Sequence, residues 1–104
     1  MANYLLAYKG GGMAQTDADR EAAMAAWGGW FGGLGGAVVD AGNPFGPSKS
    51  VASDGTSSDG AGSSLTGYTV VSAESLDAAA ALTKGCPIFA AGGSVDVYET
   101  VPVM

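Results

Sequence analysis

The order of strand-like and helix-like patterns constrains this chain more than any other feature of its sequence. Strand-like runs occupy residues 3–9, 37–41, 68–72 and 94–101, and they are rich in aromatic or β-branched residues or alternate in polarity. A helical pattern separates the first run from the second, and another separates the third from the fourth. The order predicts one α+β domain over residues 1–104.

The two helices are predicted from their caps. Thr16 is a good N-cap with acidic residues after it, and Ser75 caps a second helix that runs to Lys84 and stops at Gly85. The first helix carries an apolar stripe at helical spacing, formed by Met24, Trp27, Phe31 and Leu34. Right-handed crossovers would place both helices on one face of a four-stranded antiparallel sheet, the ferredoxin-like βαββαβ fold.

Four glycines, at positions 28, 29, 32 and 33, interrupt the first helical pattern. Each costs up to about 1 kcal/mol relative to alanine inside a helix. The helix must therefore gain stability from close approach to the sheet or to a partner chain. The alternative is that it ends near Ala26.

The segment 44–64 differs in composition from the rest of the chain. Ser, Gly and Pro make up 13 of its 21 residues, and it has no apolar periodicity. We expect this loop to be a flap, a lid or a disordered connection that adds nothing to the core.

Composition predicts a homodimer. Apolar residues make up 47% of the 104-residue chain and charged residues 13%, so apolar surface should remain after a small monomer folds. The helices cover one sheet face only, yet the strands carry many apolar side chains, namely Tyr4, Leu6, Tyr8, Val38, Val70 and Val95. We expect the uncovered face to pack against a second copy, with shielding by the flap as the alternative.

Several classes of partner and chemistry are not expected. The net charge of −6 opposes nucleic-acid binding. No apolar run approaches the roughly 20 residues that span a bilayer, and no signal-peptide pattern is present, so a cytoplasmic location without a membrane partner is predicted. The chain has no histidine and one cysteine, Cys86, which we expect to be a buried structural thiol. No metal site or cofactor is predicted.

Blocks of sequence along nearly the whole chain resemble the YCII-related (DGPF-type) proteins. They are YLLAYKGG at 4–11, VVDAGNPFG at 38–46, GYTVV at 67–71, KGCPI at 84–88 and GGSVDVY at 92–98. The resemblance implies a dimeric α+β barrel with a pocket between the two sheets. Some members of that family act on lactones or remove halogens.

The sequence departs from the family at the residues that would carry catalysis. Enzyme-like relatives have a histidine on the first helix paired with an aspartate, whereas this chain has Trp27 and Trp30 in that helix. Asp40 is the candidate catalytic residue, as a general base if burial raises its pKa. The alternative is a solvated Asp40 at a strand end, bonded to turn amides near Asn43.

Aromatic and turn residues are the candidate ligand-binding residues. The predicted pocket set is Tyr8, Trp27, Trp30, Asn43 and Tyr68. Within it, Trp27 is expected to pack in the core, and Trp30 to face the pocket or an interface. The first functional hypothesis is a module that binds a small apolar or aromatic molecule. The alternatives are a small enzyme of lactone isomerase or dehalogenase type that uses Asp40, and a structural or regulatory interaction domain.

Overall fold

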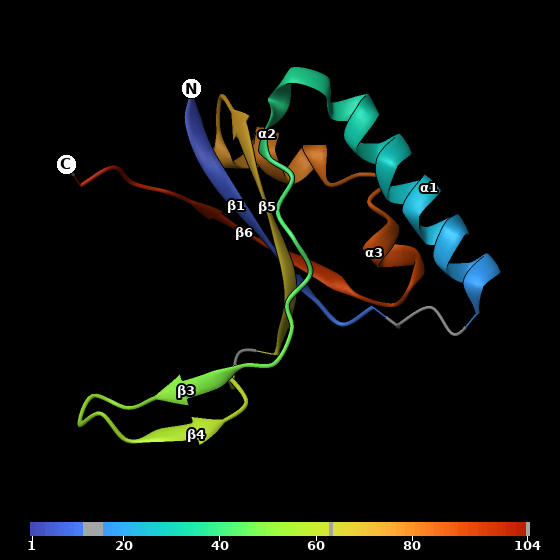
Figure 1. Ribbon diagram of the computed structural model, residues 1–104. Coiled ribbons are helices and arrows are strands. Elements are labelled where there is room, and N and C mark those ends of the chain that lie inside the picture. Colours follow the sequence, from blue (N-terminus) through green and yellow to red (C-terminus); the bar gives the residue numbers. More distant parts are fainter. Residues whose placement is uncertain (12–15, 63, 104) are drawn as a thin grey trace.

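The protein is an α+β domain with a four-stranded antiparallel sheet, helices on one side of it and a separate two-stranded hairpin (Figure 1). The structure is a computed structural model and describes residues 1–11, 16–62 and 64–103. Strands β1 (Ala2–Lys9) and β5 (Leu65–Ala73) form the centre, and β2 (Val38–Asp40) and β6 (Ser94–Glu99) form the edges, in the order β2-β5-β1-β6. This arrangement is compatible with the predicted ferredoxin-like fold.

The central pair of strands supplies the core through the alternation of its side chains. Tyr4 lies opposite Val71, and Leu6 lies opposite Thr69, on the face that the helices cover. Leu6 and Val71 are fully buried at 0% exposure. The β-branched and aromatic residues that predicted these strands therefore also build the core between the sheet and the helices.

Helix α1 (Asp17–Leu34) begins where its cap predicts. The Thr16 side chain accepts a hydrogen bond from the Asp19 amide at 3.0 Å. The helix continues through all four glycines and stops at Gly35, so the alternative of an end near Ala26 is wrong. A single 3-10 turn, η1 (Gly35–Ala37), leads into β2.

The α1 glycines have no packing partner within the described chain. A Cβ atom added at position 28, 29, 32 or 33 would meet nothing within 4 Å, and all four positions are exposed. The prediction that these glycines allow close approach to the sheet is therefore wrong. The helix is stabilised instead by the large apolar side chains between them.

The second helical region contains two short helices. Helix α2 (Leu76–Leu82) is capped by Ser75, whose hydroxyl accepts from the Ala78 amide at 3.0 Å. Gly85 follows with a φ of 80°, and Pro87 then opens helix α3 (Pro87–Ala90), which the sequence analysis did not predict. Cys86 lies between these helices and is buried as predicted, and burial raises the pKa of its thiol.

The loop 44–64 is not structureless. It contains a hairpin of β3 (Lys49–Val51) and β4 (Ser57–Asp59), stabilised by an ion pair between Lys49 Nζ and Asp59 Oδ1 at 2.8 Å. Residue 63 lies outside the described residues. Both hairpin strands are exposed, and Figure 1 shows the hairpin extending away from the main sheet. It adds nothing to the core, as predicted, and its ordered strands contradict only the alternative of a disordered connection.

The sheet face opposite the helices also carries apolar side chains, but mostly not those predicted. Tyr4, Leu6, Tyr8, Val38 and Val95 belong to the helical face by register, and Val70 alone of the predicted set belongs to the opposite face. We call that opposite surface the open face, and its main side chains are Leu5, Tyr68, Val70 and Tyr98. Lys9 and Asp96 also lie on it and pair at 2.7 Å.

The two edges of the sheet differ in length. Strand β2 has three residues, its register shifts between Val38 and Asp40, and Pro44 forms an isolated bridge to Gly67 beyond it. Strand β6 has six residues, and Thr100 continues its pairing by donating a backbone hydrogen bond to the Asn3 carbonyl at 2.9 Å. Across the described ranges, none of the helices has both the length and the apolarity needed to traverse a lipid bilayer.

Candidate functional site

A groove with a volume of about 1300 Å³ lies on the helical side of the sheet. One side of α1 from Asp19 to Phe31 and helix α3 form its walls, and the ends of β1 and β5 form its floor. Residues 41–45, which connect β2 to the hairpin, close one end. Figure 1 shows α1 standing away from the sheet with α3 beside it. One chain forms this groove, whereas the sequence predicted a pocket between the sheets of two chains.

The walls of the groove are apolar and largely aromatic. Trp27 meets Tyr8 edge to face, with ring centroids 5.2 Å apart and an interplanar angle of 73°. Met24 is 70% exposed on the same helix and would be shielded from water by a ligand in the groove. The larger apolar side chains that line the groove are Met24, Trp27, Phe31, Phe45 and Ile88.

The floor of the groove contains a short chain of hydrogen bonds. The Tyr8 hydroxyl donates to Thr69 Oγ1 at 2.7 Å, and the Thr69 hydroxyl donates to the Ala41 carbonyl at 2.8 Å. Tyr8 is 5% exposed and Thr69 is 0% exposed. Burial raises the pKa of Tyr8 to about 12. Tyr8 is therefore a neutral phenol at physiological pH.

The loop at the end of the groove depends on Gly42. This residue has a φ of 74°, and a Cβ atom at its position would collide with the Tyr68 carbonyl. The Gly42 amide donates to Asp40 Oδ1 at 2.9 Å, and the Tyr68 hydroxyl donates to Asp40 Oδ2 at 3.2 Å. The Phe45 ring stacks on Tyr68 with centroids 5.9 Å apart. Asp40 thus holds the loop that places Phe45 at the groove.

Asp40 itself is exposed and does not line the groove. Its environment matches the alternative expectation, a solvated carboxylate bonded to a turn amide near Asn43. The desolvation that a general base at this position would require is absent. The Asp40 charge instead raises the pKa of Tyr68 by disfavouring a second negative charge beside it.

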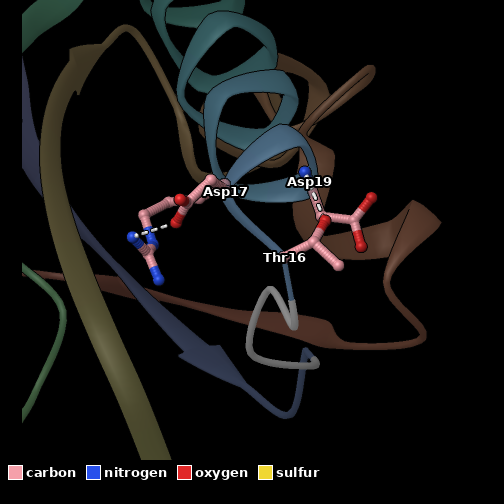
Figure 2. A network of polar contacts seen from close by, with 4 residues as sticks. Thr16, Asp17 and Asp19 are labelled. Carbon is pink, nitrogen blue, oxygen red and sulfur yellow. Dashed lines mark hydrogen bonds and ion pairs between the residues drawn. The ribbon is translucent and has the colours of Figure 1, made fainter.

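The mouth of the groove carries the charges of the α1 N-terminus. Arg20 Nη1 lies 3.1 Å from Asp17 Oδ1, one turn earlier on the helix, and both side chains are solvated. Figure 2 shows Asp17 beside the cap formed by Thr16 and the Asp19 amide. Arg20 and Asp19 both contribute to the groove lining. Opposite charges at the mouth therefore give it no strong preference for an anion or a cation.

The structure brings four of the five predicted pocket residues to the groove. Tyr8, Trp27, Asn43 and Tyr68 are among its lining residues, although the register of β5 places the Tyr68 side chain on the open face, where its hydroxyl bonds Asp40. Trp30 does not, because it is 9% exposed in the core and its Nε1 donates to the Leu82 carbonyl at 3.2 Å. Trp30 thus belongs to the core rather than to the groove, whereas Trp27 both packs against the core, as expected, and lines the groove. The hydrogen bond to Leu82 joins Trp30 to the last residue of α2.

Sequence reasoning missed Thr69 and Phe45 as groove residues. Thr69 had a usable signal, because it alternates with Gly67 and Val71 on the helical face of β5 and is the one polar residue fully buried there. Phe45 had no such signal, since it belongs to the loop 44–64, in which the sequence shows no apolar periodicity. Its position depends on the Tyr68 stacking contact.

The site offers no ready place for a metal ion. Within residues 1–11, 16–62 and 64–103, no three carboxylate or thiol side chains come together as a metal ion requires. Comparison of the chain with known protein families, with curated proteins and with solved structures finds no match.

Proposed function

We propose that this protein binds a small apolar or aromatic molecule in the groove between α1 and the sheet. The observation that carries the proposal is a groove of about 1300 Å³ whose larger lining side chains are aromatic or aliphatic. Ligand sites commonly have volumes of about 300–1000 Å³, apolar walls and a few placed polar groups. The groove has the walls, and the Tyr8 and Thr69 hydroxyls are its buried polar groups.

Binding is a better proposal than acid–base catalysis for this groove. The charged residues that line it within the described chain are Asp19 and Arg20, both solvated at the mouth. Tyr8 holds its proton well above physiological pH, and Cys86 is not among the lining residues. An enzyme of lactone isomerase or dehalogenase type that uses Asp40 is the weaker proposal, because Asp40 is exposed and outside the groove.

Isothermal titration with 2-naphthol, a neutral aromatic probe, tests the proposal. We expect saturable binding with one site per chain. The variant Ala23→Trp fills the groove wall and should abolish binding. Ala25→Trp adds the same side chain to an exposed position of the same helix that does not line the groove, and should leave binding intact. Absence of binding to the parent protein, or equal effects of the two variants, would contradict the proposal.

We further propose that the open face packs against a second copy, in a dimeric α+β barrel of the kind found in YCII-related proteins. Leu5 and Val70 are half-buried on this face, and Tyr98 is 56% exposed. Lys9 and Asp96 pair with each other there, and Asp40 lies at the β2 edge of the face, opposite Val70. The apolar centre of such a face can pack against a second copy when the two Asp40 edges lie apart.

Light scattering at tens of micromolar tests the dimer. We expect the mass of two chains for the parent protein and of one chain for Leu5→Asp, which places a charge at the centre of the open face. Val51→Asp adds the same charge to the exposed hairpin, where Val51 is 67% exposed, and should remain dimeric. A monomer mass for the parent protein would rule out the dimer and leave the groove proposal standing.

A further inference from the structure

The buried hydrogen bonds at the groove floor fix which hydrogen-bonding role a ligand can play. We propose that the groove selects aromatic molecules that donate a hydrogen bond, such as phenols and anilines, over matched molecules that only accept one. The selecting atom is the Tyr8 hydroxyl oxygen. This inference rests on the proposed function, because it assumes that a ligand occupies the groove.

The direction of each hydrogen bond follows from the Ala41 carbonyl, the last acceptor in the chain of bonds. The Ala41 carbonyl can only accept, so the Thr69 hydroxyl must use its one proton for the 2.8 Å contact with it. Thr69 Oγ1 can then only accept in its 2.7 Å contact with Tyr8. The Tyr8 proton is therefore committed to Thr69, and the free capacity of the Tyr8 oxygen is a lone pair.

Burial keeps this arrangement in place. Thr69 has 0% exposure, so water cannot supply an alternative donor or acceptor at its hydroxyl. A ligand that needed a proton from Tyr8 would have to break the bond to Thr69 to obtain it. Tyr8 lines the groove, and a ligand hydroxyl or amino group that reaches its oxygen would leave both existing bonds intact.

The consequence is a ligand class defined by its polar group. A phenol, an aniline or a primary alcohol on an apolar body satisfies the Tyr8 lone pair. An ether, an ester or a ketone presents another acceptor to it and gains nothing. A carboxylate adds repulsion to that loss, because it would direct a negative charge at the lone pair. One neutral hydrogen bond of this kind corresponds to about a fivefold difference in affinity.

The test compares 2-naphthol with 2-methoxynaphthalene, which share the ring but differ in the oxygen's ability to donate. 2-Ethylnaphthalene, which has nearly the size of the methoxy compound and no polar atom, controls for bulk. By isothermal titration the parent protein should bind 2-naphthol about fivefold more tightly than either of the others. In Tyr8→Phe the hydrogen bond is lost, so the three compounds should differ in affinity only as their sizes differ.

Thr69→Val provides a second variant with a different expected outcome. It keeps the shape of the side chain but removes the acceptor of the Tyr8 proton, so Tyr8 becomes able to donate to a ligand. 2-Methoxynaphthalene should then bind more tightly than 2-ethylnaphthalene, which it does not do in the parent protein. This variant carries the test alone if Tyr8→Phe does not fold.

The outcomes separate the two proposals. If no naphthalene compound binds the parent protein, the proposed function fails and this inference fails with it. If 2-naphthol and 2-methoxynaphthalene bind equally well, the groove binds aromatic molecules but the selection by Tyr8 is wrong. A preference for 2-naphthol that survives in Tyr8→Phe also overturns the inference.

Discussion

The two halves of helix α1 differ in what holds them in place. In the second half, Trp30 is buried and bonded to the Leu82 carbonyl, and Phe31 and Leu34 pack against the core. In the first half every residue from 17 to 26 is exposed, and Met24 reaches 70% exposure. One continuous helix is therefore packed against the domain at one end and separated from the sheet by the groove at the other.

This contrast explains how a small domain keeps a large groove. A helix that packed along its whole length would fill the space above Tyr8 with its own side chains. Anchoring by Trp30 at one end fixes the helix axis, and the cap at Thr16 keeps the other end helical without burial. The stability of the domain should therefore depend on the second half, and ligand binding on the first.

Truncation of Trp30 should have the largest effect. Trp30→Ala removes a buried aromatic side chain and its hydrogen bond, and should lower the free energy of unfolding by about 3–5 kcal/mol. Met24→Ala truncates a side chain on the exposed half of α1 and should change the free energy of unfolding by less than about 0.5 kcal/mol. Urea denaturation followed by circular dichroism measures both. Similar losses of unfolding free energy in the two variants would contradict the claim that the second half of α1 carries the stability.

High pH should destabilise the protein through Tyr8, which lies under the boundary between the halves. The folded state keeps the Tyr8 proton up to a pKa of about 12, whereas the unfolded chain loses it near the ordinary value of 10.0. The folded state binds more protons between these values, so stability is full below pH 10 and falls as pH rises toward 12. The loss is on the order of 2 kcal/mol.

Urea midpoints measured from pH 8 to 12 check this dependence, with Tyr8→Phe as the comparison. The slope above pH 10 should be smaller in that variant. Burial and the neighbouring Glu99 charge also raise the pKa of Tyr4, so part of the slope should persist. An identical slope in both proteins would show that Tyr8 does not contribute.

The α1 glycines provide a test with a smaller effect and the opposite sign. Gly32→Ala should raise the free energy of unfolding by up to about 1 kcal/mol, because the added Cβ meets nothing within 4 Å and alanine favours the helix. Denaturation at two protein concentrations measures the gain and its dependence on association. Destabilisation that grows with concentration would indicate that a partner chain packs against this part of the helix.

Removal of the hairpin should have the smallest effect. The Gly60 amide donates to the Ser48 carbonyl at 2.9 Å, so residues 49–59 can be replaced by an Asn-Gly turn without moving the ends. The free energy of unfolding should change by less than about 0.5 kcal/mol, because both hairpin strands are exposed. A loss above about 2 kcal/mol would show that the hairpin packs on the domain or on a second copy.

The sequence predicted those elements that local chemistry determines. Thr16 and Ser75 marked the helix starts because a side-chain cap acts within three residues. The runs of aromatic and β-branched residues around Tyr4 and Val71 marked the two central strands. The four-stranded antiparallel sheet with helices on one face followed from their order. Helix α3 was missed because four residues carry no periodicity.

The parts that depend on packing between distant segments were not predictable. Whether Trp27 or Trp30 faces the core depends on where α2 lies against α1, and the Leu82 carbonyl that orients Trp30 is 52 residues away in the chain. The hairpin in 44–64 depends on backbone pairing between polar residues, which leaves no apolar pattern. Four of the candidate ligand-binding residues nevertheless lie at the groove, because aromatic and turn residues concentrate at concave surfaces.

The two edges of the sheet determine how this chain can meet its own copies at high concentration. An edge strand with free backbone groups invites another strand to add to it, which is the first step toward fibrils. Strand β2 offers three residues with an irregular register and then Pro44, which has no N–H to donate. Strand β6 carries Asp96 and Glu99, so two such edges would bring like charges together. Growth by strand addition is disfavoured at both edges, which protects the protein from aggregation while its broad faces stay available for contact.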